Sequence, residues 1–282
     1  MKKNIFSNLF FVVIFEYLLY RLSMLLASKL YDWMMGWVDK SNEGLLSFME
    51  TFGSLIWLIV PLVLCIVFMA FTDRRTLSVF GNGGLLRSLK VLLLGILCGA
   101  VVNGIVSAVA IISGSVKIAF NGFSFYLFAV FLAVFIQCAC NEVLIRGYVY
   151  GTLRERYSEE VGIYVSSTLF MINCFTGMTD TVLNPIYCIN MVLFGIAMCL
   201  FIKAYGNIWI CFGFATAWKF MEKFIFGFTE AGSSSAISLY TVTENSNTFF
   251  YNTSLGNEGC YIMSIMLALL IVILYAFSRN KR

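Results

Sequence analysis

Long runs of apolar residues, separated by short clusters of charge, fill most of this 282-residue chain. A membrane-spanning helix needs about 20 apolar residues. Eight runs of roughly this length lie at about 5–28, 52–71, 91–113, 123–146, 161–177, 184–203, 207–228 and 259–278. Only 12% of the residues are charged, about half the share in a water-soluble domain. We therefore predict an all-α, polytopic membrane protein of about eight transmembrane helices, with residues 1–282 forming one integral membrane domain in a lipid bilayer.

The basic residues predict which side of the membrane each loop occupies, because Lys and Arg accumulate on the cytoplasmic side. If both termini are cytoplasmic, 13 of the 19 basic residues fall in or beside cytoplasmic segments. Only Lys29, Lys40 and Lys117 then fall in external segments. The sequence thus favours an N-in/C-in topology in a cell membrane, which we expect to be a bacterial plasma membrane. The segment 229–258, rich in Ser, Thr and Asn, is expected to be a polar external loop.

The absence of histidine excludes several chemistries at once. A Ser-His-Asp triad, a His-Glu-x-x-His zinc helix and a haem ligated by histidine all need this side chain. The nine cysteines are scattered without a Cys-x-x-Cys pair, so we expect no metal and no cofactor. The chain also lacks a basic stripe with exposed aromatic residues, so nucleic acid is not an expected partner.

Ionisable residues inside apolar runs are costly in a bilayer and mark a pathway, a site or a buried pair. Glu16 and Arg21 are expected to form a structural pair on the first run. Glu142 and Arg146 have the i,i+4 spacing and the orientation that favour an ion pair on a helix. We expect Arg146 at the cytoplasmic end of its span, with Glu142 one turn deeper in a shallow, wet position.

Two further groups of polar residues lie inside the predicted spans. Lys219, Glu222 and Lys223 are helical neighbours that would partly neutralise one another. Four asparagines are expected to hydrogen-bond between helices. These are Asn103, Asn141, Asn173 and Asn190.

Three segments resemble the motifs of the CPBP family, the CAAX-prenyl-protease and bacteriocin-processing membrane proteins also called the Abi family. Residues Cys140 to Arg154 resemble the first motif, Glu-Glu-x-x-x-Arg-Gly. Residues 166–174 resemble the second, Phe-x-x-x-His, and residues 205–220 the third, which ends in His-x-x-x-Asn. The resemblance covers about 123–228 and implies a CPBP-like helical bundle. It retains Glu142, Arg146 and Phe170 in register.

Four motif positions depart from the family pattern. Asn141 replaces the first glutamate, Cys174 and Ala215 replace the two histidines, and Lys219 replaces the asparagine. The resemblance implies that the missing groups activate the attacking water and stabilise the oxyanion. An amide accepts no proton at neutral pH, and a methyl group offers no hydrogen-bond donor. We therefore expect the protein not to be an enzyme, and the former catalytic cavity to be filled or pinned by Glu142, Arg146 and Lys219.

Other interpretations stay open at this point. Cys174 could be a nucleophilic thiolate, but such a thiolate wants a base, usually histidine, that the chain lacks. Cys174 and Cys138 could also share a metal. Buried cysteine is a common small apolar residue, so a structural role is expected for both. The first functional hypothesis is a degenerate CPBP protein that binds a peptide or lipidated peptide, for self-immunity or as an accessory in peptide maturation. The second is an active intramembrane endopeptidase that uses Glu142. The third is a small membrane transporter whose intramembrane charges line a path.

Overall fold

The computed structural model of the protein describes residues 8–39, 84–176, 184–229 and 237–279, together with a few separate positions between 41 and 81. Its long helices are α1 (Leu9–Met35), α3 (Gly84–Ile112), α4 (Tyr126–Glu142), α6 (Glu159–Thr176), α7 (Pro185–Tyr205), α8 (Trp209–Phe220) and α9 (Tyr261–Arg279). The predicted all-α class is confirmed. Seven of the eight expected runs form helices, and the run 52–71 lies almost wholly outside the described residues.

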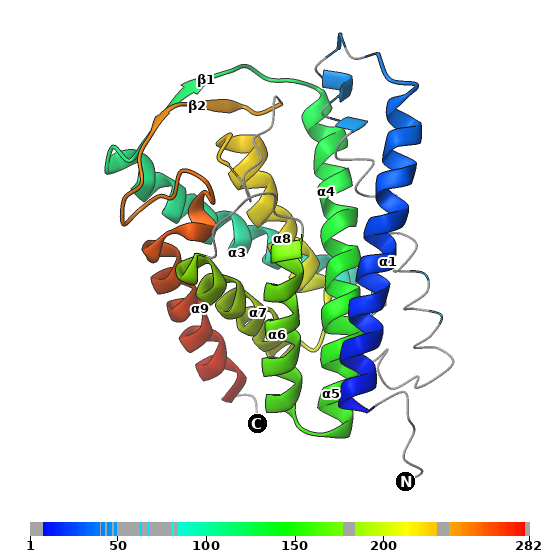
Figure 1. Ribbon diagram of the computed structural model, residues 1–282. Helices are drawn as coiled ribbons and strands as arrows, with labels where there is room; N and C mark the ends of the chain where they lie inside the picture. Colours follow the sequence, from blue (N-terminus) through cyan, green and yellow to red (C-terminus); the bar gives the residue numbers. More distant parts are fainter. Residues whose placement is uncertain are drawn as a thin grey trace.

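Four helical stretches in the described part of the chain are long and apolar enough to cross a membrane. They are Gly84–Ile112, Tyr126–Arg156, Pro185–Tyr205 and Tyr261–Arg279. α1 begins and α9 ends at the same end of the bundle (Figure 1). A chain that crosses the membrane an even number of times has both ends on the same side. The predicted N-in/C-in topology requires the same arrangement. The protein is thus an α-helical integral membrane protein.

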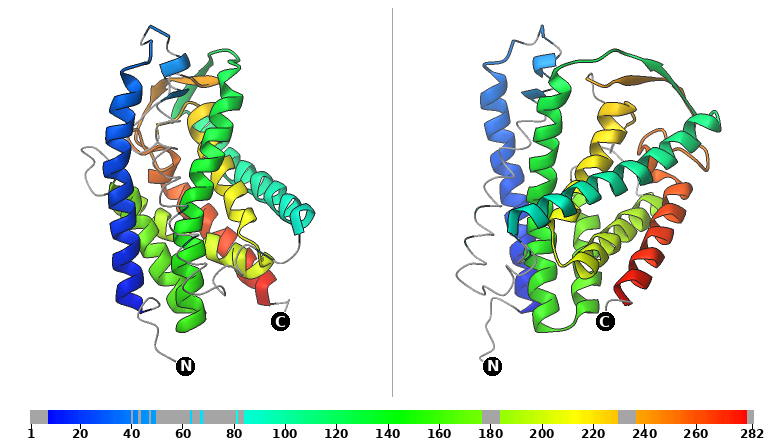
Figure 2. Two further views of the ribbon diagram at one scale, coloured as in Figure 1. Left: turned by 90° about the vertical axis from the view of Figure 1, so that its right-hand side faces the viewer. Right: turned by 180° about the vertical axis from the view of Figure 1, so that it is seen from behind.

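A short antiparallel ribbon lies at the opposite end of the bundle (Figure 2). It pairs β1 (Val116–Phe120) with β2 (Tyr240–Asn245), and Lys117 forms an exposed ion pair with Glu244 across the strands. The described part of the expected external loop 229–258, which is residue 229 and residues 237–258, therefore has structure of its own. Its last part, which includes the 3-10 turn η5 (Asn257–Gly259), is buried against the helices rather than surrounded by solvent.

The helix α8 occupies the centre of the bundle and packs on α3, α4 and α7. Its contact with α3 depends on glycines. A Cβ atom added at Gly95 would overlap the carbonyl oxygen of Ile210, and one added at Gly213 would overlap that of Leu92. Gly95 and Gly99 have the Gly-x-x-x-Gly spacing that lets two membrane helices approach to backbone contact. This contact fixes the helix that carries the third motif.

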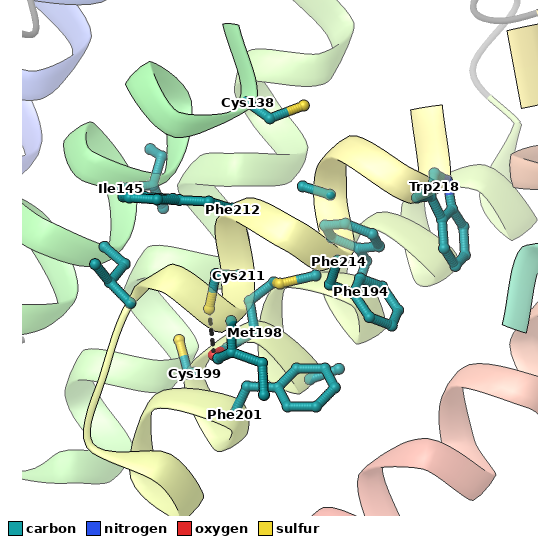
Figure 3. Close-up of a cluster of buried hydrophobic side chains, with 14 of the residues drawn as sticks. Cys138, Ile145, Phe194, Met198, Cys199, Phe201, Cys211, Phe212, Phe214 and Trp218 are labelled. Carbon is teal, nitrogen blue, oxygen red and sulfur yellow. Dashed lines mark hydrogen bonds between the residues drawn. The ribbon is translucent and has the colours of Figure 1, made fainter. Parts of the chain in front are cut away.

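Aromatic and sulfur-containing side chains fill the core between α7 and α8 (Figure 3). Phe194 meets Trp218 edge to face at 5.1 Å between ring centroids, and Phe201 lies 5.3 Å from Phe214. Cys211 donates a hydrogen bond from its thiol to the carbonyl of Met198 at 3.3 Å. Edge-to-face ring pairs contribute more than their buried area alone, so this core holds α8 at a fixed rotation against α7.

The helix that carries the first motif does not end at Arg146. After α4 it continues through a π-helical segment, η3 (Val143–Tyr150), into α5 (Gly151–Arg156), and every residue of η3 is buried. A second π-helical segment, η4 (Met221–Ile225), follows the third motif on α8. The expectation of a shallow, wet Glu142 is therefore wrong, because helix and packing continue past it and leave it 1% exposed. Such wide turns occur frequently at functional sites.

Candidate functional site

The three motif segments meet at one cavity of about 170 Å³. Side chains from α1, α4, η3, α6, α7, α8 and η5 form its wall. All the singled-out motif positions except Arg146 line it, namely Asn141, Glu142, Phe170, Cys174, Ala215 and Lys219. Positions up to 78 residues apart in the chain are thus brought together, as the motif spacing predicts. The cavity was expected to be filled or pinned. That it is filled is wrong, because the side chains that line it leave open space between them, and that it is pinned stays a prediction.

The three retained motif residues form one packed unit. Arg146 Nε lies 3.3 Å from Glu142 Oε2, and both side chains are almost fully buried, so the predicted i,i+4 pair is confirmed. The guanidinium carbon of Arg146 lies 4.6 Å from the centroid of the Phe170 ring. A guanidinium over an aromatic face is held by electrostatic attraction to the ring. Arg146 therefore supports both Glu142 on α4 and Phe170 on α6, which places two walls of the cavity.

The charged residues of α1 have partners that sequence spacing did not predict. Asn173 donates to Glu16 Oε1 at 2.7 Å, and the hydroxyl of Tyr20 donates to the carbonyl of Asn173 at 3.2 Å. Arg21 is exposed and donates to the hydroxyl of Tyr17 at 3.0 Å. The expected Glu16–Arg21 pair is therefore wrong. A spacing of five places two residues poorly on one helix face, and a neighbouring helix supplies a better donor. These bonds tie α1 to the end of α6 beside Cys174.

Glu222 at the start of η4 is bound by other elements. Its carboxylate accepts from Asn103 on α3 at 3.3 Å and from the backbone N–H of Asn257 at 2.7 Å. The side-chain amide of Asn257 also donates to the hydroxyl of Ser107 at 2.9 Å. The prediction that buried asparagines bond between helices is confirmed for Asn103, as it is for Asn173. This polar network anchors the inner part of the loop against α3 and η4.

Of the two carboxylates that line the cavity, sequence reasoning missed Glu258, in the turn η5. It lines the cavity and is 7% exposed. Trp218 donates its indole N–H to Glu258 Oε1 at 3.2 Å. Asn190 on α7 donates to the carbonyl of Glu258 at 2.8 Å and to that of Cys260 at 3.0 Å. No motif or period in the sequence signals this residue, because it belongs to a segment with the composition of a polar loop.

The cysteines at the cavity do not form a metal site within the described residues. Cys138 is buried and Cys174 is half-buried, and both line the cavity. The described residues contain no group of three His, Cys, Asp or Glu side chains placed to hold a metal ion. The walls are otherwise mostly apolar. The cavity can thus hold an apolar group beside a few fixed polar contacts, which is how small-molecule sites in proteins are generally built.

Comparison with known families supports the class of protein that the fold and cavity define. Residues 123–221 match the family described as Rce1-like, type II CAAX prenyl endopeptidase Rce1-like. This core is similar to the CPBP family of CAAX prenyl endopeptidases, as the resemblance based on its motifs predicted. The match includes all seven motif positions, from Asn141 to Lys219, but neither Tyr20 nor Glu258. No curated protein matches the chain.

Proposed function

We propose that this CPBP-type membrane protein binds a peptide or lipidated peptide in its cavity and does not cut it. One observation carries the proposal: the cavity at the meeting point of the motifs is open, while Asn141, Cys174, Ala215 and Lys219 line it in place of the family's acid, base and oxyanion groups. Such a protein suits self-immunity to a secreted peptide or an accessory role in peptide maturation. Its membrane would be a bacterial plasma membrane.

The chemistry of these four positions supports binding over turnover. Removing a general base costs about 10²–10⁴ in rate, and removing an oxyanion donor costs about 10²–10³. The chain has no histidine with which to replace either group. Glu142, the motif carboxylate that is retained, is engaged by Arg146. The retained residues therefore account for the shape of the cavity without supplying a water-activating pair.

The alternative is an active intramembrane endopeptidase that uses Glu142, and one observation favours it. Glu258 brings a second carboxylate to the cavity, from an element outside the family motifs. Two carboxylates on one cavity are able to divide the roles of acid and base when their surroundings differ. Glu142 faces a guanidinium and Glu258 an indole N–H, so their surroundings do differ.

A paired binding and cleavage assay separates the two functions. The full-length protein in nanodiscs would be mixed with a library of leader-bearing and lipid-anchored peptides, and captured and cleaved peptides would be identified by mass spectrometry. Glu142→Ala is the site variant, and Leu269→Ala, on the exposed face of α9, is the matched control. Capture of intact peptides without turnover supports the proposal. Turnover that Glu142→Ala abolishes and Leu269→Ala leaves unchanged would overturn it in favour of the endopeptidase.

A further inference from the structure

Aromatic rings form much of the cavity wall. Tyr20, Phe170, Tyr187, Phe194 and Trp218 all line it. The volume of about 170 Å³ is close to that of an engineered apolar cavity of about 150 Å³ that admits benzene. The cavity therefore has room for a single ring or branched side chain, and not for a folded peptide. Aromatic faces attract cations and repel anions, because the face of each ring carries partial negative charge.

Three side chains of the acidic and basic residue types line the same cavity, namely Glu142, Lys219 and Glu258. Arg146 balances the charge of Glu142 at 3.3 Å. The charge that a ligand meets in the cavity therefore depends on Lys219 and Glu258. Lys219 is half-buried and carries its ammonium on a flexible four-carbon stem. Glu258 has a short side chain and is held in place at its backbone and at its carboxylate.

Several elements fix Glu258 in position. Asn190 holds the backbone of η5 with two hydrogen bonds, and Ser264 donates to Asn190 Oδ1 at 2.6 Å. Trp218 adds the indole N–H to the carboxylate. Burying a carboxylate is costly, and ionisable groups within membrane proteins commonly mark functional sites.

We infer that the cavity recognises a cationic group, an ammonium or a guanidinium, seated between the carboxylate of Glu258 and the aromatic rings. The inference rests on the proposed function, in which the cavity binds a ligand, and it names the chemistry of that ligand. A peptide would enter with a lysine or arginine side chain, or with its amino terminus. Glu258 is then the residue that determines specificity, and Trp218 positions it.

Thiol reagents of opposite charge test the inference without knowledge of the natural ligand. Cys174 lines the cavity and is half-buried. The full-length protein in nanodiscs would be treated with methanethiosulfonates that carry a trimethylammonium or a sulfonate group, and rates at each cysteine read by mass spectrometry. We expect Cys174 to react faster with the cationic reagent, on the order of tenfold after correction for intrinsic reactivity. Cys188, on α7 and outside the cavity, is the internal control.

Substitutions assign the preference to Glu258. Glu258→Gln keeps the shape of the side chain and removes its charge, so the ratio of the two rates at Cys174 should fall to about one, and the ratio at Cys188 should not change. Lys219→Gln should raise the ratio at Cys174. A faster reaction of the anionic reagent with the wild-type protein would overturn the inference. A ratio that Glu258→Gln leaves unchanged would overturn it as well.

A measurement on the unmodified protein covers the case in which Glu258→Gln does not fold. The probe 2-phenylethylammonium should protect Cys174 from a neutral methanethiosulfonate, and 3-phenylpropanoate should not. Equal protection by both probes, or by neither, contradicts the inference. Failure of the proposed function is distinguishable from these outcomes. If no peptide is captured while charge still governs the rate at Cys174, the cavity selects cations but is not a peptide site. If peptides bind without dependence on Glu258, only the present inference fails.

Discussion

Replacing Arg146 by methionine would remove the charge that balances Glu142 at the motif core. The two side chains lie 3.3 Å apart and are almost fully buried, so the variant would leave the carboxylate of Glu142 buried without its counter-charge. Removal of one member of a buried ion pair costs about 3–5 kcal/mol, whereas replacing both members by uncharged groups is often close to neutral. The packing of Arg146 over Phe170 adds to the loss in the single variant. We therefore expect Arg146→Met to lower the free energy of unfolding by about 4 kcal/mol.

The double variant Glu142→Gln, Arg146→Met should recover most of this loss, which corresponds to a coupling energy of about 3 kcal/mol between the two positions. Equilibrium unfolding in mixed micelles, followed by far-ultraviolet circular dichroism, would measure all four members of the cycle. Simple addition of the two single effects would refute the reasoning. In that case the pair would not be a mutually dependent unit, and the retention of Arg146 would need another explanation.

Three more predictions concern the elements around the cavity. Gly95→Val should force α3 and α8 apart and lower the free energy of unfolding by about 3 kcal/mol. The control Gly104→Ala, whose Cβ would lie 4.0 Å from its nearest neighbour, should not lower it. Equal losses in the two variants would contradict the backbone contact. Asn190→Leu should cost about 1–3 kcal/mol and speed amide hydrogen exchange around Glu258, and unchanged exchange there would mean that Asn190 does not hold η5. Lys117→Gln at the exposed ribbon should change the free energy of unfolding by less than about 1 kcal/mol, and a larger loss would show that the ion pair secures the ribbon.

The sequence was sufficient to predict the features that depend on local patterns. Apolar runs of span length predicted the helices, and the i,i+4 spacing predicted the contact between Glu142 and Arg146. The motif spacing predicted that Cys174 and Ala215 would lie on one cavity. The Gly-x-x-x-Gly pattern at Gly95 and Gly99 was not singled out from the sequence, although it depends only on residues four apart.

Features that depend on contacts between distant segments could not be predicted in this way. The donor to Glu16 is Asn173, which is 157 residues away. Glu258 reaches the cavity because Asn190 and Trp218 hold a turn that has no periodic pattern of its own. The continuation of the helix past Arg146 was missed because charged residues mark the expected end of a span, yet η3 buries the arginine fully.

The order in which the chain is synthesised bears on when the cavity can form. Its wall draws on Tyr20, near the start of the chain, and on Glu258, near the end. The segment that matches the CPBP family ends at residue 221, before β2 and η5 have been made. A ribosome that has just completed the third motif has therefore produced every motif position but not the carboxylate of η5 or the helix α9. The wall of the cavity is therefore incomplete until residue 258 has been synthesised.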